Sequence, residues 1–256
     1  MRAMQNEQAK SAPLASPPLL DPHRHALFLD LDGTLLEIQE RPHAVHASPE
    51  LCDLLRRVSY SMSGAIAVIT GRTIIDADSI LHGAINFIAG VHGYEMQRGG
   101  QIAHAEAQMT RLDFARADLR QLLREHQIPA LIEDKGASLA LHYRHAPDAA
   151  ADVRRIGAHI AHARGLRLLE GKMVVELIAS SRTKGHALTV FMAQPPFAGR
   201  LPVSIGDDRT DEDAFAAAQR LGGWGVLVGS AHESGASYTL AGPTAVMAWL
   251  ESSLHG

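Results

Sequence analysis

Two carboxylates one residue apart, Asp30 and Asp32, stand at the end of an apolar run that begins at Ala26, and a glycine and a threonine follow them. Such a run is typical of a buried strand that delivers its last residues to the edge of a parallel sheet, where ligands commonly bind. Two acids held this close repel each other unless a cation lies between them. The pattern therefore predicts a divalent metal site, and its oxygen ligands suit Mg2+.

Three later segments carry groups that could act at the same sheet edge. Each follows a predicted strand or begins a predicted helix, and all are expected on one side of one sheet. Acids after strands are common turn residues, so each segment alone would be weak support for a site. Their order along a single chain favours a common site. The groups are Thr70 with Gly71 and Arg72, then Lys184, then the acidic run Asp207, Asp208 and Asp211.

Together these groups could transfer a phosphoryl group. Carboxylates of Asp30 and Asp207, with the backbone carbonyl of Asp32, can bind a magnesium ion. A free oxygen of one metal-bound acid can attack phosphorus and form an aspartyl-phosphate. The Thr70 hydroxyl, the Lys184 ammonium and the backbone N–H groups of the turn after Asp32 can neutralise the phosphoryl oxygens. Asp32 can then protonate the leaving oxygen and activate water.

The composition argues against several other classes of protein. The chain has 256 residues, of which 46% are hydrophobic and 20% charged, as in ordinary soluble domains. A formal net charge of −4 and the absence of a long Lys/Arg cluster argue against nucleic-acid binding. One cysteine, Cys52, cannot form an internal disulfide. Without a signal sequence or a run long enough to cross a membrane, the expected location is the cytoplasm, and a monomer is expected.

Strands and helices alternate over residues 23–106 and again over residues 181–256. This alternation predicts an α/β fold with a doubly wound, Rossmann-like parallel sheet as its core. Residues 107–180 follow a different order of helix, two strands, helix and two strands, which predicts an inserted α+β (αββαββ) cap. Residues 1–22 are polar and rich in proline, and we expect a disordered tail there.

Local signals set some boundaries within the core. Ser48, which a proline follows, predicts the start of a helix over residues 48–58. Thr210 is expected to cap a helix over residues 211–219. A hairpin is expected over residues 94–103, where two adjacent glycines separate two short strands.

Four segments, taken in order, resemble the four motifs of the haloacid dehalogenase superfamily of phosphatases. They are Asp30-Leu-Asp32-Gly33-Thr34, Ile69-Thr70-Gly71-Arg72, Lys184-Gly185 and Gly206-Asp207-Asp208-Arg-Thr210-Asp211. The resemblance implies that Asp30 is the nucleophile and Asp32 the general acid and base. It implies that Thr70 and Lys184 bind phosphate, and so do the neighbouring Gly33, Gly71 and Arg72. The implied metal ligands are Asp30, Asp32, Asp207 and Asp208.

The insertion resembles the cap of the trehalose-6-phosphate phosphatase family. The similar segments are Glu133-Asp-Lys135-Gly136, Leu139-Ala-Leu-His142-Tyr143-Arg144, Gly171-Lys172-Met-Val-Val-Glu176 and, in the core, Gly90-Val-His92-Gly93. The resemblance implies magnesium-dependent hydrolysis of trehalose 6-phosphate to trehalose and phosphate. It implies that Lys172 and Glu176 bind sugar hydroxyls, with Lys135 and Arg144 as further candidates, whereas His92 is expected to be structural.

Other functions stay open on the sequence alone. The same chemistry could act on another sugar phosphate, such as sucrose 6-phosphate, or move phosphate within a sugar, as a phosphomutase does. A catalytically idle sugar-phosphate-binding module would be expected to lack one of the acids Asp30, Asp32 and Asp207, and all three are present. A receiver domain of the response-regulator type also accepts phosphate on aspartate, but the large insertion argues against it.

Overall fold

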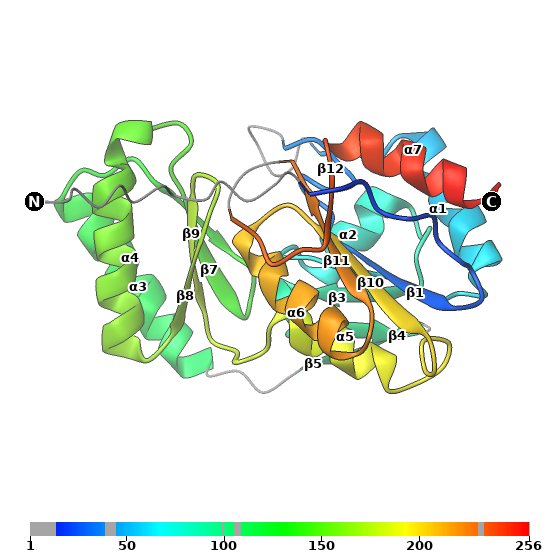
Figure 1. Ribbon diagram of the computed structural model, residues 1–256. Coiled ribbons are helices and arrows are strands. Elements are labelled where there is room, and N and C mark those ends of the chain that lie inside the picture. The colour runs from blue at the N-terminus through cyan, green and yellow to red at the C-terminus, as the bar shows by residue number, and fades with distance from the viewer. Residues whose placement is uncertain (1–13, 39–44, 99, 105–108, 230–232, 256) are drawn as a thin grey trace, which may run out of the picture.

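The computed structural model describes residues 14–38, 45–98, 100–104, 109–229 and 233–255. Two separate sheets organise this part of the chain (Figure 1). The larger sheet has eight strands in the order β12-β11-β10-β1-β2-β3-β4-β5, and the smaller has four in the order β6-β7-β9-β8. Within the described parts of the chain, every helix is too short or too polar to span a bilayer.

The larger sheet is parallel from β12 to β3 and ends in two antiparallel edge strands. Its strands are β1 (His25–Leu29), β2 (Ile66–Ile69), β3 (Phe87–Gly90), β4 (Glu95–Arg98), β5 (Gln101–His104), β10 (Leu201–Gly206), β11 (Trp224–Val228) and β12 (Tyr238–Leu240). This topology confirms the predicted α/β fold. The predicted hairpin is confirmed as β4 and β5.

Helices cover both faces of the larger sheet. One face carries α1 (Pro49–Ser61), α2 (Ile74–Leu81) and α7 (Pro243–Ser253), and the other carries α5 (Lys184–Met192) and α6 (Glu212–Arg220) (Figure 1). Strand β1 is buried along its whole length. Its Phe28 ring lies 5.3 Å from the Phe197 ring and 6.3 Å from the Phe191 ring of α5. This packing fixes the strand whose next residue is Asp30.

The smaller sheet is antiparallel and carries two helices on the face away from the core (Figure 1). Its elements, in chain order, are α3 (Met109–Glu125), β6 (Leu131–Asp134), β7 (Ser138–His142), α4 (Ala150–Arg164), β8 (Arg167–Gly171) and β9 (Val174–Ile178). Residues such as Leu141 and Val175 pack against the helices. Because side chains alternate along a strand, Glu176 and its partner Leu169 face the core instead. The predicted αββαββ order is confirmed, and the boundaries 107 and 180 stay a prediction.

The segment before β1 differs from the expected tail. Residues 1–13 lie outside the described residues, but residues 14–22 pack on the core. Trp249 Nε1 of α7 donates to the Pro18 carbonyl at 3.1 Å, and the Thr239 amide of β12 donates to the Ala15 carbonyl at 3.0 Å. Leu20 is buried. The polar, proline-rich composition led to the prediction of disorder, because it contains few apolar residues to signal this packing.

The two expected helix caps had different outcomes. Ser48 caps α1, since its hydroxyl accepts from the Leu51 amide at 3.2 Å, as predicted. The expectation for Thr210 was wrong, because a short 3-10 helix, η4 (Arg209–Asp211), precedes α6. Asp208 caps this turn, and Asp211 returns the bond by accepting from the Asp208 amide at 3.1 Å. Two side chains that bond each other's backbone hold the turn better than the single threonine could.

Candidate active site

Three buried carboxylates meet at the carboxyl ends of β1 and β10. Asp30 follows β1, Asp207 follows β10 and Asp211 ends η4, and one oxygen of each lies within 4.8 Å of the others. Burial raises the pKa of Asp30 to about 7, although Lys184 opposes the effect. Burial and the charge of Asp30 raise the pKa of Asp207 to about 6. Buried acids that hold protons so readily favour a cation at this position.

Lys184 links two of these acids. Its Nζ lies 2.8 Å from Asp30 Oδ1 and 2.8 Å from Asp211 Oδ1, and the side chain is 3% exposed. Burial alone would lower the pKa of Lys184, but Asp211 and Asp30 outweigh it and the pKa is raised. The side chain of Thr183 caps α5 by accepting from the His186 amide at 3.2 Å. The cap fixes where the helix begins and therefore where the ammonium lies.

The oxygens of this cluster suit Mg2+. Asp211 uses one oxygen for Lys184 and the other for the Asp208 amide, so it holds neighbours in place. Asp30 pairs with Lys184 through Oδ1, and Asp207 pairs with Lys172 through Oδ2, so each carboxylate has a second oxygen that could bind a metal ion. Buried, anionic and hard, these oxygens are the ligands that Mg2+ prefers.

Two of the acids proposed as metal ligands lie outside the cluster. Arg72 holds both oxygens of Asp32, with Nε 2.6 Å from Oδ2 and Nη2 2.7 Å from Oδ1. The carboxylate of Asp208 accepts from the Arg209 amide at 2.7 Å. Neither residue belongs to the group of three acids found among the described residues. Asp32 could still contribute its backbone carbonyl, as the sequence suggested.

The loops after β1 and β2 place the predicted phosphate-binding groups. Thr70 is 1% exposed, and its Oγ1 accepts from the Arg72 amide at 3.1 Å. Gly33 has a φ of +83°, and its amide donates to the Leu36 carbonyl at 2.7 Å. The Gly33 amide is therefore engaged within its own turn. The Gly71 carbonyl accepts from Lys135 of the smaller sheet.

The smaller sheet reaches the core through its lysines. Lys172, at the turn between β8 and β9, forms an ion pair with Asp207. Arg144 lies behind this turn and donates to the Lys172 carbonyl at 3.4 Å. Lys135, at the turn between β6 and β7, donates to the Gly71 carbonyl at 3.1 Å. Two of the four predicted sugar-binding residues therefore contact the predicted catalytic loops directly.

Glu176 joins the two sheets through a buried network. Ser138 Oγ donates to its Oε1 at 2.5 Å, and Lys135 Nζ lies 3.5 Å from the same oxygen. His92 Nε2 lies 3.2 Å from Oε2. Burial alone would raise the pKa of Glu176, but Lys135 and His92 outweigh it and the pKa is lowered. Burial also lowers the pKa of His92, so its neutral imidazole donates from Nε2.

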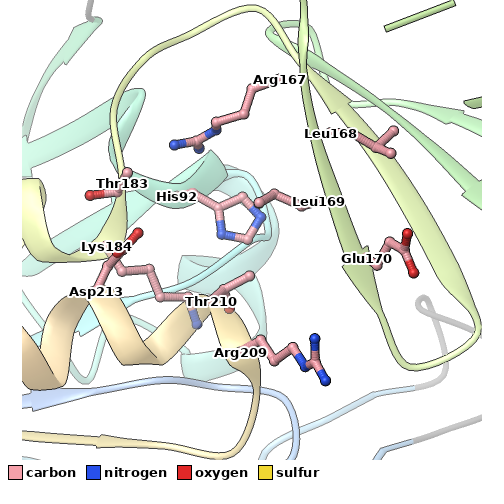
Figure 2. Close-up of a pocket in the computed structure, with 10 residues that line it drawn as sticks. All are labelled: His92, Arg167, Leu168, Leu169, Glu170, Thr183, Lys184, Arg209, Thr210 and Asp213. Atoms are coloured by element: carbon pink, nitrogen blue, oxygen red, sulfur yellow. The ribbon is translucent and has the colours of Figure 1, made fainter. Parts of the chain in front are cut away.

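A cavity of about 360 Å³ lies beside this network (Figure 2). Strand β8 forms one wall, and the beginnings of α5 and α6 with η4 form the other. Its lining residues are His92, Arg167, Leu168, Leu169, Glu170, Thr183, Lys184, Arg209, Thr210 and Asp213. Since Lys184 also touches Asp30, the cavity adjoins the acidic cluster.

Two site residues escaped the sequence-based selection. Asp211 was noted but not assigned as a ligand, although it stands four residues after Asp207, and the short η4 turn brings its carboxylate back beside that of Asp207. His92 was the one histidine expected near the core site, with a structural role, and it contacts Glu176 of the smaller sheet. The available signal was the position of His92 just after the end of β3, on the same sheet edge as Asp30.

The same fold occurs in a solved haloacid dehalogenase-like hydrolase from Bacteroides thetaiotaomicron. That structure matches with a TM-score of 0.61 and 16% identity, over 90% of this chain and 99% of the other. This likeness shows that the two chains share a fold. A family model described as trehalose-phosphatase matches residues 28–244, and the chain belongs to this family of phosphoric monoester hydrolases.

Two curated relatives support this assignment. A probable trehalose-phosphate phosphatase of Sinorhizobium fredii is 40% identical over 206 residues, which are 80% of this chain and 77% of the relative. The trehalose-6-phosphate phosphatase of Escherichia coli is 36% identical over 243 residues, covering 93% of this chain and 90% of the relative. The similarity thus extends over both sheets.

Proposed function

We propose that the chain is a magnesium-dependent phosphatase that hydrolyses trehalose 6-phosphate to trehalose and phosphate through a phosphorylated Asp30. The observation that carries the proposal is the position of Asp30. It lies at the end of a buried strand, 2.8 Å from the Lys184 ammonium and beside Asp207. A carboxylate nucleophile needs this combination of burial and nearby positive charge. Family membership supplies the choice of substrate.

Each core group then has a role in the first step. Asp30 attacks phosphorus, while Lys184 and the Thr70 hydroxyl bind the phosphoryl oxygens and neutralise their charge. Asp211 keeps Lys184 in place from the opposite side at 2.8 Å. Asp30 and Asp207 would hold the magnesium ion, which supplies further positive charge at phosphorus when bound.

Asp32 is proposed as the acid and base of both steps. It first protonates the oxygen that leaves with the sugar, and it then takes a proton from the water that attacks phospho-Asp30. Arg72 holds both oxygens of Asp32, whose side chain remains 34% exposed. Arg72 therefore keeps this carboxylate in place without removing it from the site.

Four cap residues, Lys135, Arg144, Lys172 and Glu176, are proposed to bind the sugar. In this structure they bond protein groups, such as Asp207, the Gly71 carbonyl and His92. Sugar hydroxyls would replace some of these partners when substrate enters, and the covering cap would exclude bulk water from the reaction.

Phosphate release from a panel of sugar phosphates tests the proposal. With Mg2+ present, trehalose 6-phosphate should be hydrolysed with the highest kcat/KM, ahead of sucrose 6-phosphate and glucose 6-phosphate. EDTA should abolish release, and added Mg2+ should restore it. A phosphomutase or an idle binding module would release no phosphate. If the enzyme preferred sucrose 6-phosphate, the proposed phosphatase mechanism would stand, but trehalose 6-phosphate would be rejected as its substrate.

Gly33 offers a further prediction about how closely the site is packed. A Cβ at this position would fall on the Asp207 carboxylate, and a φ of +83° disfavours any side chain. We expect Gly33→Ala to lower the free energy of unfolding by about 1–3 kcal/mol and to reduce kcat at least tenfold or so. Thermal unfolding and phosphate release measure the two effects. Gly83→Ala is the matched control, because φ is also positive there and space is open; equal losses in both variants would contradict the steric argument.

A further inference from the structure

Glu95, the first residue of β4, bonds a helix that begins beside the site. Its Oε2 accepts from the amide of Ile74, the first residue of α2, at 2.7 Å. Gly90 lies directly opposite Glu95 in the antiparallel pair of β3 and β4. A Cβ on Gly90 would lie 2.8 Å from Glu95 Oε2 and 2.8 Å from the Ile74 nitrogen. The glycine therefore leaves room for the carboxylate to cross the neighbouring strand and reach the helix.

The bond from Glu95 is one that α2 does not supply itself. The first amides of a helix have no acceptor within the helix. The side chain of Thr73 caps α2, but it accepts from the Asp76 amide at 3.2 Å. The Ile74 amide bonds Glu95 instead, and a carboxylate at this end of a helix is also favoured by the helix dipole. Glu95 thus fixes the first turn of α2.

The corner after β3 holds the same turn from a second side. Arg72 lies two residues before Ile74, and its carbonyl accepts from the Val91 amide at 2.8 Å. Val91 has a φ of +45°, a conformation that is rare for a β-branched residue. Strained residues of this kind persist where the surrounding structure fixes them, and they are concentrated at active sites. The backbone of Arg72 is therefore held between Val91 and the turn that Glu95 fixes.

Arg72 transmits this arrangement to Asp32. Its Nε lies 2.6 Å from Asp32 Oδ2, and its Nη2 lies 2.7 Å from Oδ1. Because a bidentate bond is directional, a shift of the Arg72 backbone would also shift the carboxylate. A displacement of about 1 Å can slow an enzymatic reaction by about 100-fold. Glu95 itself lies outside the acidic cluster, so its influence on the chemistry would pass through Arg72.

We infer that Glu95 is a positioning residue for the general acid: it holds the first turn of α2, and with it the Arg72 guanidinium that orients Asp32. The inference rests on the proposed function, because it concerns the proton that Asp32 gives to the leaving group. As the bond from phosphorus to the sugar oxygen breaks, its electron pair goes to that oxygen, which takes the proton from Asp32. p-Nitrophenolate is a stable anion that leaves without a proton.

The ratio of kcat/KM for these two kinds of ester tests the role of Glu95. Glu95→Ala should lower kcat/KM for trehalose 6-phosphate by about tenfold or more, and should change kcat/KM for p-nitrophenyl phosphate by less than about threefold. Glu95→Gln keeps an oxygen that can accept from the Ile74 amide. It should stay within about threefold of wild type on both substrates.

Ser48→Ala is the matched control for the lost bond. It also removes a side-chain acceptor from an amide in the first turn of a helix, since Ser48 Oγ accepts from the Leu51 amide of α1 at 3.2 Å. This variant should lower Tm by roughly a few degrees, as Glu95→Ala does, but should leave the ratio of the two kcat/KM values unchanged. A loss of stability alone therefore cannot produce the expected result.

A double variant tests whether Glu95 acts through Arg72. Once Arg72→Ala is present, Glu95→Ala should have no further effect on the ratio. Glu95→Asp, which is one methylene shorter, should reproduce the change in ratio if the alanine variant folds poorly. The positioning role fails if Glu95→Ala or Glu95→Asp lowers kcat/KM equally on both substrates, or if the effects of Arg72→Ala and Glu95→Ala multiply. A wild type that prefers another sugar phosphate would overturn only the proposed substrate, and the ratio measured with that ester would then decide the role of Glu95.

Discussion

Asp30→Asn should reduce phosphate release from trehalose 6-phosphate by roughly 10,000-fold or more. The amide has nearly the shape of the carboxylate but cannot attack phosphorus. Folding should survive, because burial raises the pKa of Asp30 to about 7 and the folded protein already disfavours the charge there. Acid-quenched enzyme incubated with phosphate-labelled substrate should retain label in the wild type and none in the variant.

Asp53→Asn is the matched control for this experiment. Asp53 lies on α1 with a side chain 67% exposed, and it pairs with the solvent-exposed Arg57. Its loss should leave kcat within about twofold of wild type. Ordinary turnover or a labelled intermediate in Asp30→Asn would end the assignment of the nucleophile.

Asp207→Asn should stabilise the metal-free protein and abolish its response to Mg2+. Burial and Asp30 raise the pKa of Asp207 from 3.8 to about 6 in the folded state. The group's favourable contribution to folding is therefore complete below pH 4 and is lost as the pH rises through about 6. At pH 7.5 the wild type holds an unfavourable buried charge, so its removal should add on the order of 1–3 kcal/mol to the free energy of unfolding.

Thermal unfolding in EDTA and in Mg2+, at pH 7.5 and pH 5, measures both effects. In EDTA the variant should melt above the wild type at pH 7.5, and the gap should narrow at pH 5, where the wild-type carboxyl is protonated. Added Mg2+ should raise the Tm of the wild type at pH 7.5 but not that of the variant. A less stable variant at pH 7.5, or one that Mg2+ still stabilises, would contradict the role of Asp207.

The sequence could predict those features that depend on one segment at a time. Strand β1 is a continuous apolar run, so its burial and the position of Asp30 and Asp32 at its end follow from pattern alone. The order of the motifs then places four segments at one sheet edge. The four-stranded insertion is equally predictable from sequence, because its strands and helices have clear apolar periodicity.

Partners across the fold could not be predicted in this way. Asp32 was expected near the metal, but the bidentate pair with Arg72 joins positions 40 residues apart. The contact between His92 and Glu176 joins residues 84 apart, one in each sheet, and depends on how the cap sits on the core. Such bonds depend on the final packing of separate segments, which local patterns do not encode. Sequence identified the groups and the structure identified their neighbours.

The hairpin turn that carries Lys172 gives the protein a built-in counter-ion. Since Lys172 occupies one oxygen of Asp207, an arriving cation meets a carboxylate whose charge is already compensated. If Asp207 holds a metal ion as proposed, loading the site would exchange the positive charge of Lys172 for that of an ion from solution. Under the proposed function, the displaced ammonium of Lys172 would then be free to bind an incoming sugar.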